Sequence, residues 1–144
     1  MKKRLLFLTV WLWIIIIVGA FIAIGSFTDA LHVKKLASSD NPFTKMLLQK
    51  RNLNVEFYAN IACSIIGLVN IVASVLILKW DKNGFWAMIS TCVTSFLLLW
   101  HASYGGKINV SALITFFACL IGFIILVIVV QIKIDDKNCW EQLE

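Results

Sequence analysis

Four long runs of apolar residues constrain the fold of this chain more than any other feature. They cover residues 5–28, 57–78, 84–106 and 108–132, and none of them contains Asp, Glu, Lys or Arg. A helix needs about 20 apolar residues to cross the hydrocarbon core of a bilayer, and it satisfies its own backbone hydrogen bonds in lipid. Each run therefore predicts one membrane-spanning helix.

The composition excludes a soluble protein. Of the 144 residues, 60% are hydrophobic and 15% are charged, whereas soluble domains are about half apolar and about a quarter charged. A soluble domain this small could not bury so much apolar surface. The short connections at residues 79–83 and 107 make the last three spans antiparallel neighbours. We expect a single integral membrane domain over residues 1–144, folded as an all-α, four-transmembrane-helix antiparallel bundle.

The basic residues indicate how the chain lies in the membrane. The net charge is +5, and the cations lie between the apolar runs and at the termini, where membrane lipids with anionic headgroups, and no nucleic acid, are the expected partners. With the N-terminus inside, seven Lys and Arg lie on the inner side and six on the outer side. The N-terminal cluster at 2–4 decides the orientation, because the first helix usually dominates it. The first run is also longer than the apolar region of a signal peptide, so we expect it to be retained. We predict a multi-pass protein of the cell (inner, cytoplasmic) membrane with both termini cytoplasmic.

The longest connection, residues 29–56, is predicted to be an extracytoplasmic loop. Asp40, Asn41 and Pro42 form a helix-start signal, in which a capping side chain precedes a proline at the first helical position. Apolar residues then recur at helical spacing as far as Lys50. This pattern predicts a short amphipathic helix lying on the outer leaflet, or a helix that continues directly into the second span. A role of the loop in binding a partner is a further alternative.

Small and weakly polar residues recur at three- and four-residue spacing along the second, third and fourth spans. Interfaces between membrane helices use such residues, because lipid provides no hydrophobic drive for association. The candidate intramembrane polar contacts are Asn60, Ser64, Asn70, Thr94 and Thr115. We interpret them as helix packing with interhelical hydrogen bonds. The alternative is a polar pathway through the bundle, although transport pathways usually contain acids or bases.

The first span is poorer in small residues than the other three. Its only pair at small-x-x-x-small spacing is Gly19 and Ala23, and close approach of membrane helices depends on such residues. We therefore expect the first span to pack more peripherally than the others.

Side chains able to carry out chemistry are scarce in the apolar runs. His101, near the outer end of the third span, is the candidate pH-sensitive residue, because histidine changes its charge near neutral pH; a structural role at the interface is the alternative. Cys63, Cys92 and Cys119 lie singly in different spans and are expected to act as small apolar side chains. The chain has no nucleotide-binding, zinc-protease or serine-hydrolase motif. We predict no catalytic residue, no cofactor, no metal and no enzymatic activity.

Two segments that follow apolar spans are alike, LKWDKNGFW at 78–86 and IKIDDKNCW at 132–140. Convergent anchoring at the membrane interface explains this likeness, and a duplicated helix hairpin is the alternative. The chain also resembles a group of small, uncharacterised bacterial integral membrane proteins with four helices. The resemblance lies in TVWLW at 9–13, in the first of these two turns, and in QIK at 131–133 followed by WEQL at 140–143. It implies the four-helix membrane fold and brings no reaction, ligand or site.

Three classes of function remain after these exclusions. The leading hypothesis is a non-enzymatic membrane protein that acts by helix–helix association, with itself as a homo-oligomer or with a membrane protein partner, as an accessory, scaffold or immunity-type component. The alternative is a subunit of an oligomeric pore or small-solute transporter. A lipid-acting enzyme is the least supported, because the spans lack acids and activated nucleophiles.

Overall fold

Four long helices make up most of the described chain. The computed structural model describes residues 6–38, 53–79, 81–103, 108–131, 133–134 and 137–138. The helices are α1 (Leu6–Ala37), α3 (Leu53–Leu78), α4 (Lys82–Ala102) and α5 (Val110–Val130). All four are long and apolar enough to cross a membrane, which confirms the prediction of four spanning helices. The all-α prediction did not include one detail, a short antiparallel pairing of β1 (Lys133–Ile134) with β2 (Lys137–Asn138).

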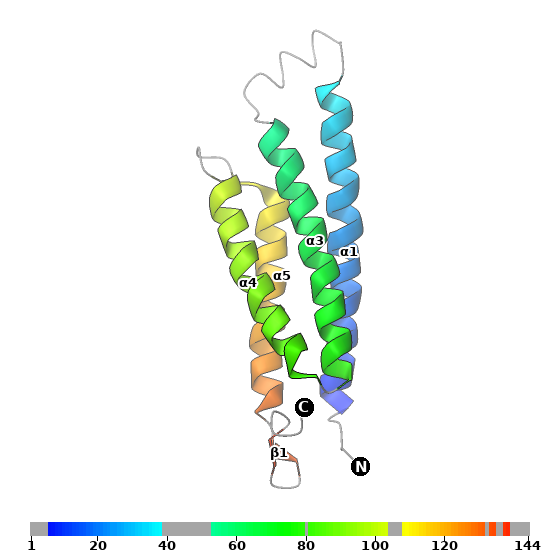
Figure 1. Cartoon of the computed structure of the whole chain (residues 1–144), viewed down its shortest axis with the longest axis vertical. Helices are drawn as coiled ribbons and strands as arrows, with labels where there is room; N and C mark the ends of the chain where they lie inside the picture. The colour runs from blue at the N-terminus through cyan, green and yellow to red at the C-terminus, as the bar shows by residue number, and fades with distance from the viewer. Residues whose placement is uncertain are drawn as a thin grey trace.

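The helices lie side by side along one long axis (Figure 1). One end of the bundle, called here the terminal end, is where α1 and α4 begin and where α3 and α5 end. The opposite end, called the loop end, is where α1 ends and α3 begins (Figure 1). Two side-chain caps start the shorter helices: Asp81 Oδ1 accepts from the Asn83 N–H at 2.8 Å, and Asn109 Oδ1 accepts from the Ala112 N–H at 2.9 Å. Each cap satisfies an N–H group that the helix itself leaves unpaired.

Helix α1 is longer than the apolar run that predicted it. The run ends at residue 28, but the helix continues through residues 29–37, which were expected to be part of the connecting loop. This extension carries Asp29, His32, Lys34 and Lys35, yet it contains neither Gly nor Pro, so nothing in it ends the helix. Helix α3 likewise starts at Leu53, before the predicted start of its span at residue 57. The amphipathic helix expected from Asp40 to Lys50 lies outside the described residues.

Helix α1 packs most extensively against α3, so the expectation that the first span is peripheral was wrong. A Cβ atom added to Gly67 would lie 2.7 Å from the Gly19 carbonyl oxygen and 2.9 Å from the Ala23 nitrogen. The two backbones therefore approach so closely that only glycine fits at position 67. Ser64 reinforces this contact, because its Oγ donates to the Ala23 carbonyl oxygen at 2.8 Å. A single small-residue pair on α1 suffices, since α3 supplies a matching glycine.

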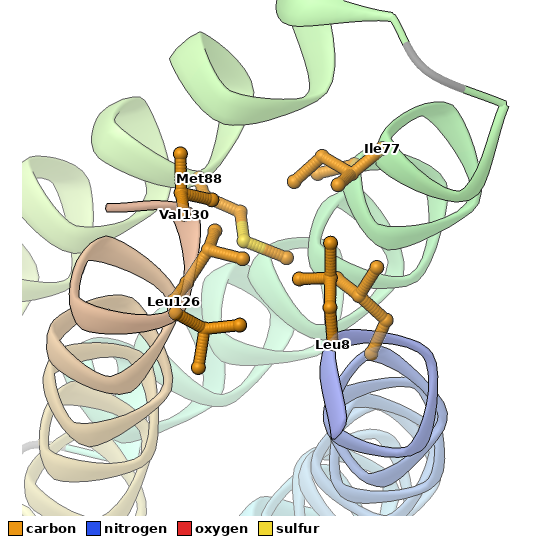
Figure 2. Close-up of a cluster of buried hydrophobic side chains, with 8 residues drawn as sticks. Leu8, Ile77, Met88, Leu126 and Val130 are labelled. Carbon is orange, nitrogen blue, oxygen red and sulfur yellow. The ribbon is translucent and has the colours of Figure 1, made fainter. Parts of the chain in front are cut away.

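A cluster of apolar side chains joins all four helices at the terminal end. Its buried members are Leu8, Leu12, Ala73, Ile77, Met88, Leu126, Val129 and Val130. Figure 2 shows side chains from α1, α3, α4 and α5 pointing toward one another in this cluster. Leu126 is 0% exposed and Leu12 is 1% exposed, so the terminal end of the bundle is closed by close-packed aliphatic groups.

Candidate functional site

Asn70 lies at the centre of a buried polar cluster, although it sits within an apolar helix. Its side chain is 7% exposed. Its Oδ1 accepts a hydrogen bond from Thr91 Oγ1 of α4 at 2.7 Å, and its Nδ2 donates to Cys119 Sγ of α5 at 3.1 Å. One asparagine of α3 is thereby bonded to both neighbouring helices, and burying its amide costs little because both of its polar atoms have partners.

Neighbouring side chains extend this cluster without adding a charge. Cys92 Sγ donates to the Cys119 carbonyl oxygen at 3.3 Å, and Ser95 Oγ donates to the Cys92 carbonyl oxygen at 2.9 Å. We call Asn70, Thr91, Cys92, Ser95 and Cys119 the Asn70 cluster. Cys92 and Cys119 are free thiols. A neutral cluster of this kind fixes which faces of α3, α4 and α5 meet, but it offers no acid, base or charged ligand for catalysis.

The hydroxyl of Thr91 has two acceptors within reach. Its Oγ1 lies 2.7 Å from Asn70 Oδ1 and 2.8 Å from the Met88 carbonyl oxygen. A hydroxyl carries one hydrogen, so Thr91 bonds either to its own helix or to α3. The backbone carbonyl oxygen of Asn70 accepts a separate bond within α3, from Ser74 Oγ at 2.9 Å. If Asn70 were removed, the Thr91 hydroxyl could therefore still donate to the Met88 carbonyl oxygen within α4.

Asn60 lies in a different environment, close to the loop end. It is 5% exposed, and its Oδ1 has no hydrogen-bond partner among the residues that the structure describes. A buried acceptor left without a partner costs about 1–3 kcal/mol. Asn60 lines a cavity of about 300 Å³ together with Asp29 and His32 of α1, Glu56 of α3, and Asn109 and Ser111 at the start of α5. This cavity gathers the most polar part of the described bundle.

The structure keeps the two predicted asparagines apart. Asn70 lines a cavity of about 150 Å³ that is mostly apolar, whereas Asn60 belongs to the polar cavity at the loop end. A third cavity, lined mostly by apolar residues, lies between the two, and the polar atoms of Asn70 are bound to Thr91 and Cys119. The described residues therefore favour the packing interpretation of Asn70 over a polar pathway that joins it to Asn60.

The other predicted residues have separate positions. Ser64 bonds to α1, as described above. Thr115 is 1% exposed, and its Oγ1 donates to the Ser111 carbonyl oxygen of its own helix at 2.8 Å. Thr94 is exposed and likewise donates to its own helix, to the Ser90 carbonyl oxygen at 2.8 Å. His101 is exposed at the end of α4.

Sequence reasoning missed the group at the loop end because it assigned residues 29–56 to a loop. Once α1 is extended, Asp29 and His32 are three residues apart on a helix and share one face. Glu56 is likewise four residues from Asn60 on α3. A check for helix-breaking residues after position 28 would have revealed this grouping, since none occurs before Ala37.

The described residues of this site offer hydrogen-bonding groups, the imidazole of His32 and the carboxylates of Asp29 and Glu56. Within the described ranges, no group of three or more His, Cys, Asp or Glu side chains could hold a metal ion. The fold and the buried polar contacts place the chain in the class of helical, multi-pass membrane proteins. The chain matches no known protein family, and no characterised protein and no solved structure is significantly similar to it.

Proposed function

We propose that the chain is a non-enzymatic integral membrane protein that acts by helix–helix association through the outward face of α4. Its role would be that of an accessory, scaffold or immunity-type component. Five exposed residues lie on this face at spacings of seven, four, three and four, with the exposed Trp86 between the first two. We call the five the α4 polar face: Asn83, Ser90, Thr94, Leu97 and His101. This spacing places all five on one side of a helix, as in a helix–helix seam.

The α4 polar face is the main support for the proposal, because hydroxyl groups that face lipid find no hydrogen-bond partner in the lipid. Ser90 Oγ donates to the Trp86 carbonyl oxygen at 3.0 Å, and Thr94 Oγ1 donates to the Ser90 carbonyl oxygen at 2.8 Å. These bonds make the two hydroxyls tolerable in lipid, while their oxygens still have lone pairs able to accept from another helix. Small and hydroxyl-bearing residues on a lipid-facing helix are typical of an interface between membrane helices.

The position of α4 supports the same proposal. Helix α4 packs on α3 and less extensively on α5, and only 17% of the residues in its most apolar window are buried, the smallest fraction among the four helices. Ser64, Asn70 and Thr115, which are buried polar residues of α3 and α5, are already engaged within the chain, and the unpartnered Oδ1 of Asn60 lies at the loop end. The outward side of α4 is therefore the described helix surface best suited to a second helix, either from another copy or from a different membrane protein.

The topology that goes with this proposal is an antiparallel bundle in the cell (inner, cytoplasmic) membrane, with both termini in the cytoplasm. It is supported by the even number of helices able to span a membrane and by the basic cluster that precedes α1. The loop end, with Asp29, His32 and Glu56, would then face the extracytoplasmic side.

Site-specific photo-crosslinking in native membranes tests the proposal. A photoreactive amino acid replaces Thr94, and the matched control carries it at Val72, which is 59% exposed on α3. We expect a protein adduct of defined mass from position 94 and lipid adducts from position 72. The mass of the adduct distinguishes a second copy from a different protein. The same photoreactive residue is also placed at positions 90 and 97. If positions 90, 94 and 97 all give lipid adducts alone, the proposal is contradicted.

The alternative, a subunit of an oligomeric pore or small-solute transporter, has less support. A pathway would need polar groups that are free to contact a solute, but Asn70 is engaged with Thr91 and Cys119. Solute or ion flux into liposomes distinguishes the two functions. Flux that falls in both Asn60→Leu and Asn70→Leu would favour the pore or transporter.

A further inference from the structure

A continuous groove runs between α1 and α5. It consists of three adjoining cavities: the first and second share Val18, Ile22 and Ala118 as lining residues, and the second and third share Asp29 and Ser111. The cavities therefore follow one another from the apolar region beside Asn70 to the polar cavity at the loop end. We call this feature the α1/α5 groove.

Missing side chains keep the groove open. A Cβ atom added to Gly25 would meet nothing within 4 Å, and one added to Gly122 would meet only Ile15, at 3.7 Å. Towards the terminal end the two helices come together, where Trp11 Nε1 donates to the Gly122 carbonyl oxygen at 3.3 Å. Below this contact lies the apolar cluster with Leu12 and Leu126. The groove is therefore closed at its deep end and open along its side.

The groove is long enough for one acyl chain. At the rise of an α-helix it follows α5 for about 17 Å from Ser111 to Gly122 and α1 for about 27 Å from Asp29 to Trp11, and one leaflet of the hydrocarbon core is about 15 Å thick. Its three cavities measure about 150, 320 and 300 Å³, so together they have room for a chain of methylene groups.

The walls of the groove change character along its length. In the deep and middle parts, exposed apolar side chains border it, including Val18 and Phe21 of α1 and Ile114 of α5. A hydrocarbon chain can therefore enter sideways from the surrounding lipid. At the loop end the described lining residues include two carboxylates, Asp29 and Glu56, and among these described residues there is neither Lys nor Arg.

Two further features of the mouth point to a ligand that donates hydrogen bonds. The buried Oδ1 of Asn60, which lines the mouth, has no partner among the described residues. Among the described residues, the partner of Asp29 Oδ2 is Ser111 Oγ, at a long distance of 3.5 Å. An ammonium group brings several donors and a positive charge, whereas an anionic headgroup brings acceptors that these carboxylates repel.

We propose that the α1/α5 groove binds one acyl chain of an amine-bearing phospholipid from the leaflet at the loop end. The chain lies between α1 and α5 with its methyl end near Trp11. The ammonium group of the headgroup lies at the mouth, beside Asp29 and Asn60. This site is separate from the α4 polar face, so either proposal can fail without affecting the other.

Tryptophan quenching by brominated lipid tests the site. The full-length protein keeps Trp11 as its only tryptophan, with the other five changed to phenylalanine, and is reconstituted in phosphatidylglycerol vesicles. A small mole fraction of phosphatidylethanolamine brominated near the end of its acyl chains is then added. The reference is the matched protein that keeps only Trp13, which is 55% exposed on the same helix and reports bulk lipid.

We expect Trp11 to be quenched more than Trp13 by brominated phosphatidylethanolamine, and no such excess with brominated phosphatidylglycerol at the same fraction. Asp29→Asn should lower the preference about three-fold, as expected for an ion pair near a surface. Gly25→Leu should abolish the excess by filling the groove. Gly25→Ala should retain it, because its added methyl group is small and meets no neighbour.

Three outcomes would overturn the proposal. Parallel quenching of Trp11 and Trp13 by both lipids would mean that the groove holds only bulk lipid. An excess with brominated phosphatidylglycerol would refute the amine preference. Protection of Trp11 from both lipids would mean that protein, such as a second copy of the chain, fills the groove. Circular dichroism of each variant confirms that the helices are retained.

Discussion

Helix α1 has two seams with opposite character. Against α3 it packs so closely that an added methyl group at Gly67 would meet backbone atoms at 2.7 and 2.9 Å. Against α5 it leaves a groove in which an added methyl group at Gly25 meets nothing within 4 Å. The same helix thus packs closely against α3 on one side and borders an open groove on the other. A glycine in a membrane helix therefore does not by itself indicate close packing, because its role depends on the residues of the neighbouring helix.

The difference between the seams arises from the residues of the partner helices. Along α3, the small residues Ser64 and Gly67 face Gly19 and Ala23, and Ser64 adds a hydrogen bond across the seam. Along α5, Gly122 faces the larger Ile15 without close contact. The seam between α1 and α3 is tight because small residues of the two helices face one another. The seam between α1 and α5 is open because the small residue Gly122 faces a large residue, Ile15, instead of another small one.

The largest effect is expected at the tight seam. Gly67→Leu should lower the free energy of unfolding by about 3 kcal/mol, because the added side chain collides with the backbone of α1 and forces it away. Unfolding by sodium dodecyl sulfate in mixed micelles, followed by circular dichroism, measures this loss. The matched control is Gly25→Leu, for which we expect a change below about 0.5 kcal/mol. Equal losses in both variants would contradict the contrast between the seams.

A smaller effect is expected from the hydrogen bond across the tight seam. Ser64→Ala removes the bond to the Ala23 carbonyl oxygen, and hydrogen bonds between membrane helices contribute about 0.6 kcal/mol on average. The same unfolding measurement applies. Thr94→Ala is the control, since its bond lies within α4 and its side chain is exposed, so stability should not change. A loss in Thr94→Ala as large as that in Ser64→Ala would refute this account of the Ser64 bond.

The smallest effect is expected at the open seam. Gly122→Ala places a methyl group at ordinary contact distance from Ile15, and the unfolded chain in a micelle keeps its helices. The free energy of unfolding should therefore change by less than about 0.5 kcal/mol. A loss above about 1 kcal/mol would mean that α1 and α5 approach more closely than described, and would also narrow the α1/α5 groove.

The sequence predicted the helices better than their contacts. Apolar runs identify spans because crossing lipid imposes a length and excludes charge, and all four spans were found. The end of α1 was missed because the apolar run stops at the first charged residue, whereas the helix does not. Outside lipid a helix can continue through charged residues, as α1 does through Lys34 and Lys35. Helix ends in water depend on capping and on breaking residues more than on polarity.

The partners of the predicted polar residues could not be derived from one sequence. Periodicity places Asn70 on a face of α3, but its bonds to Thr91 and Cys119 depend on the rotation and register of three helices. Similar hydroxyl residues had different outcomes, because Ser64 bonds to α1 whereas Thr94 bonds to its own helix. Hydroxyl groups in helices have this local alternative, so residue type alone does not decide between them.

The extension of α1 determines where the chain emerges from the membrane. Nine residues, 29–37, continue the helix beyond the apolar run, which adds about 13 Å to its length. The headgroup layer on one side of a bilayer is only about 5–8 Å thick. With the hydrocarbon boundary at residue 28, where the apolar run ends, Ala37 would lie past the headgroups. A partner of this end of α1 would then approach from the aqueous phase, and the α1/α5 groove would be reached from the lipid.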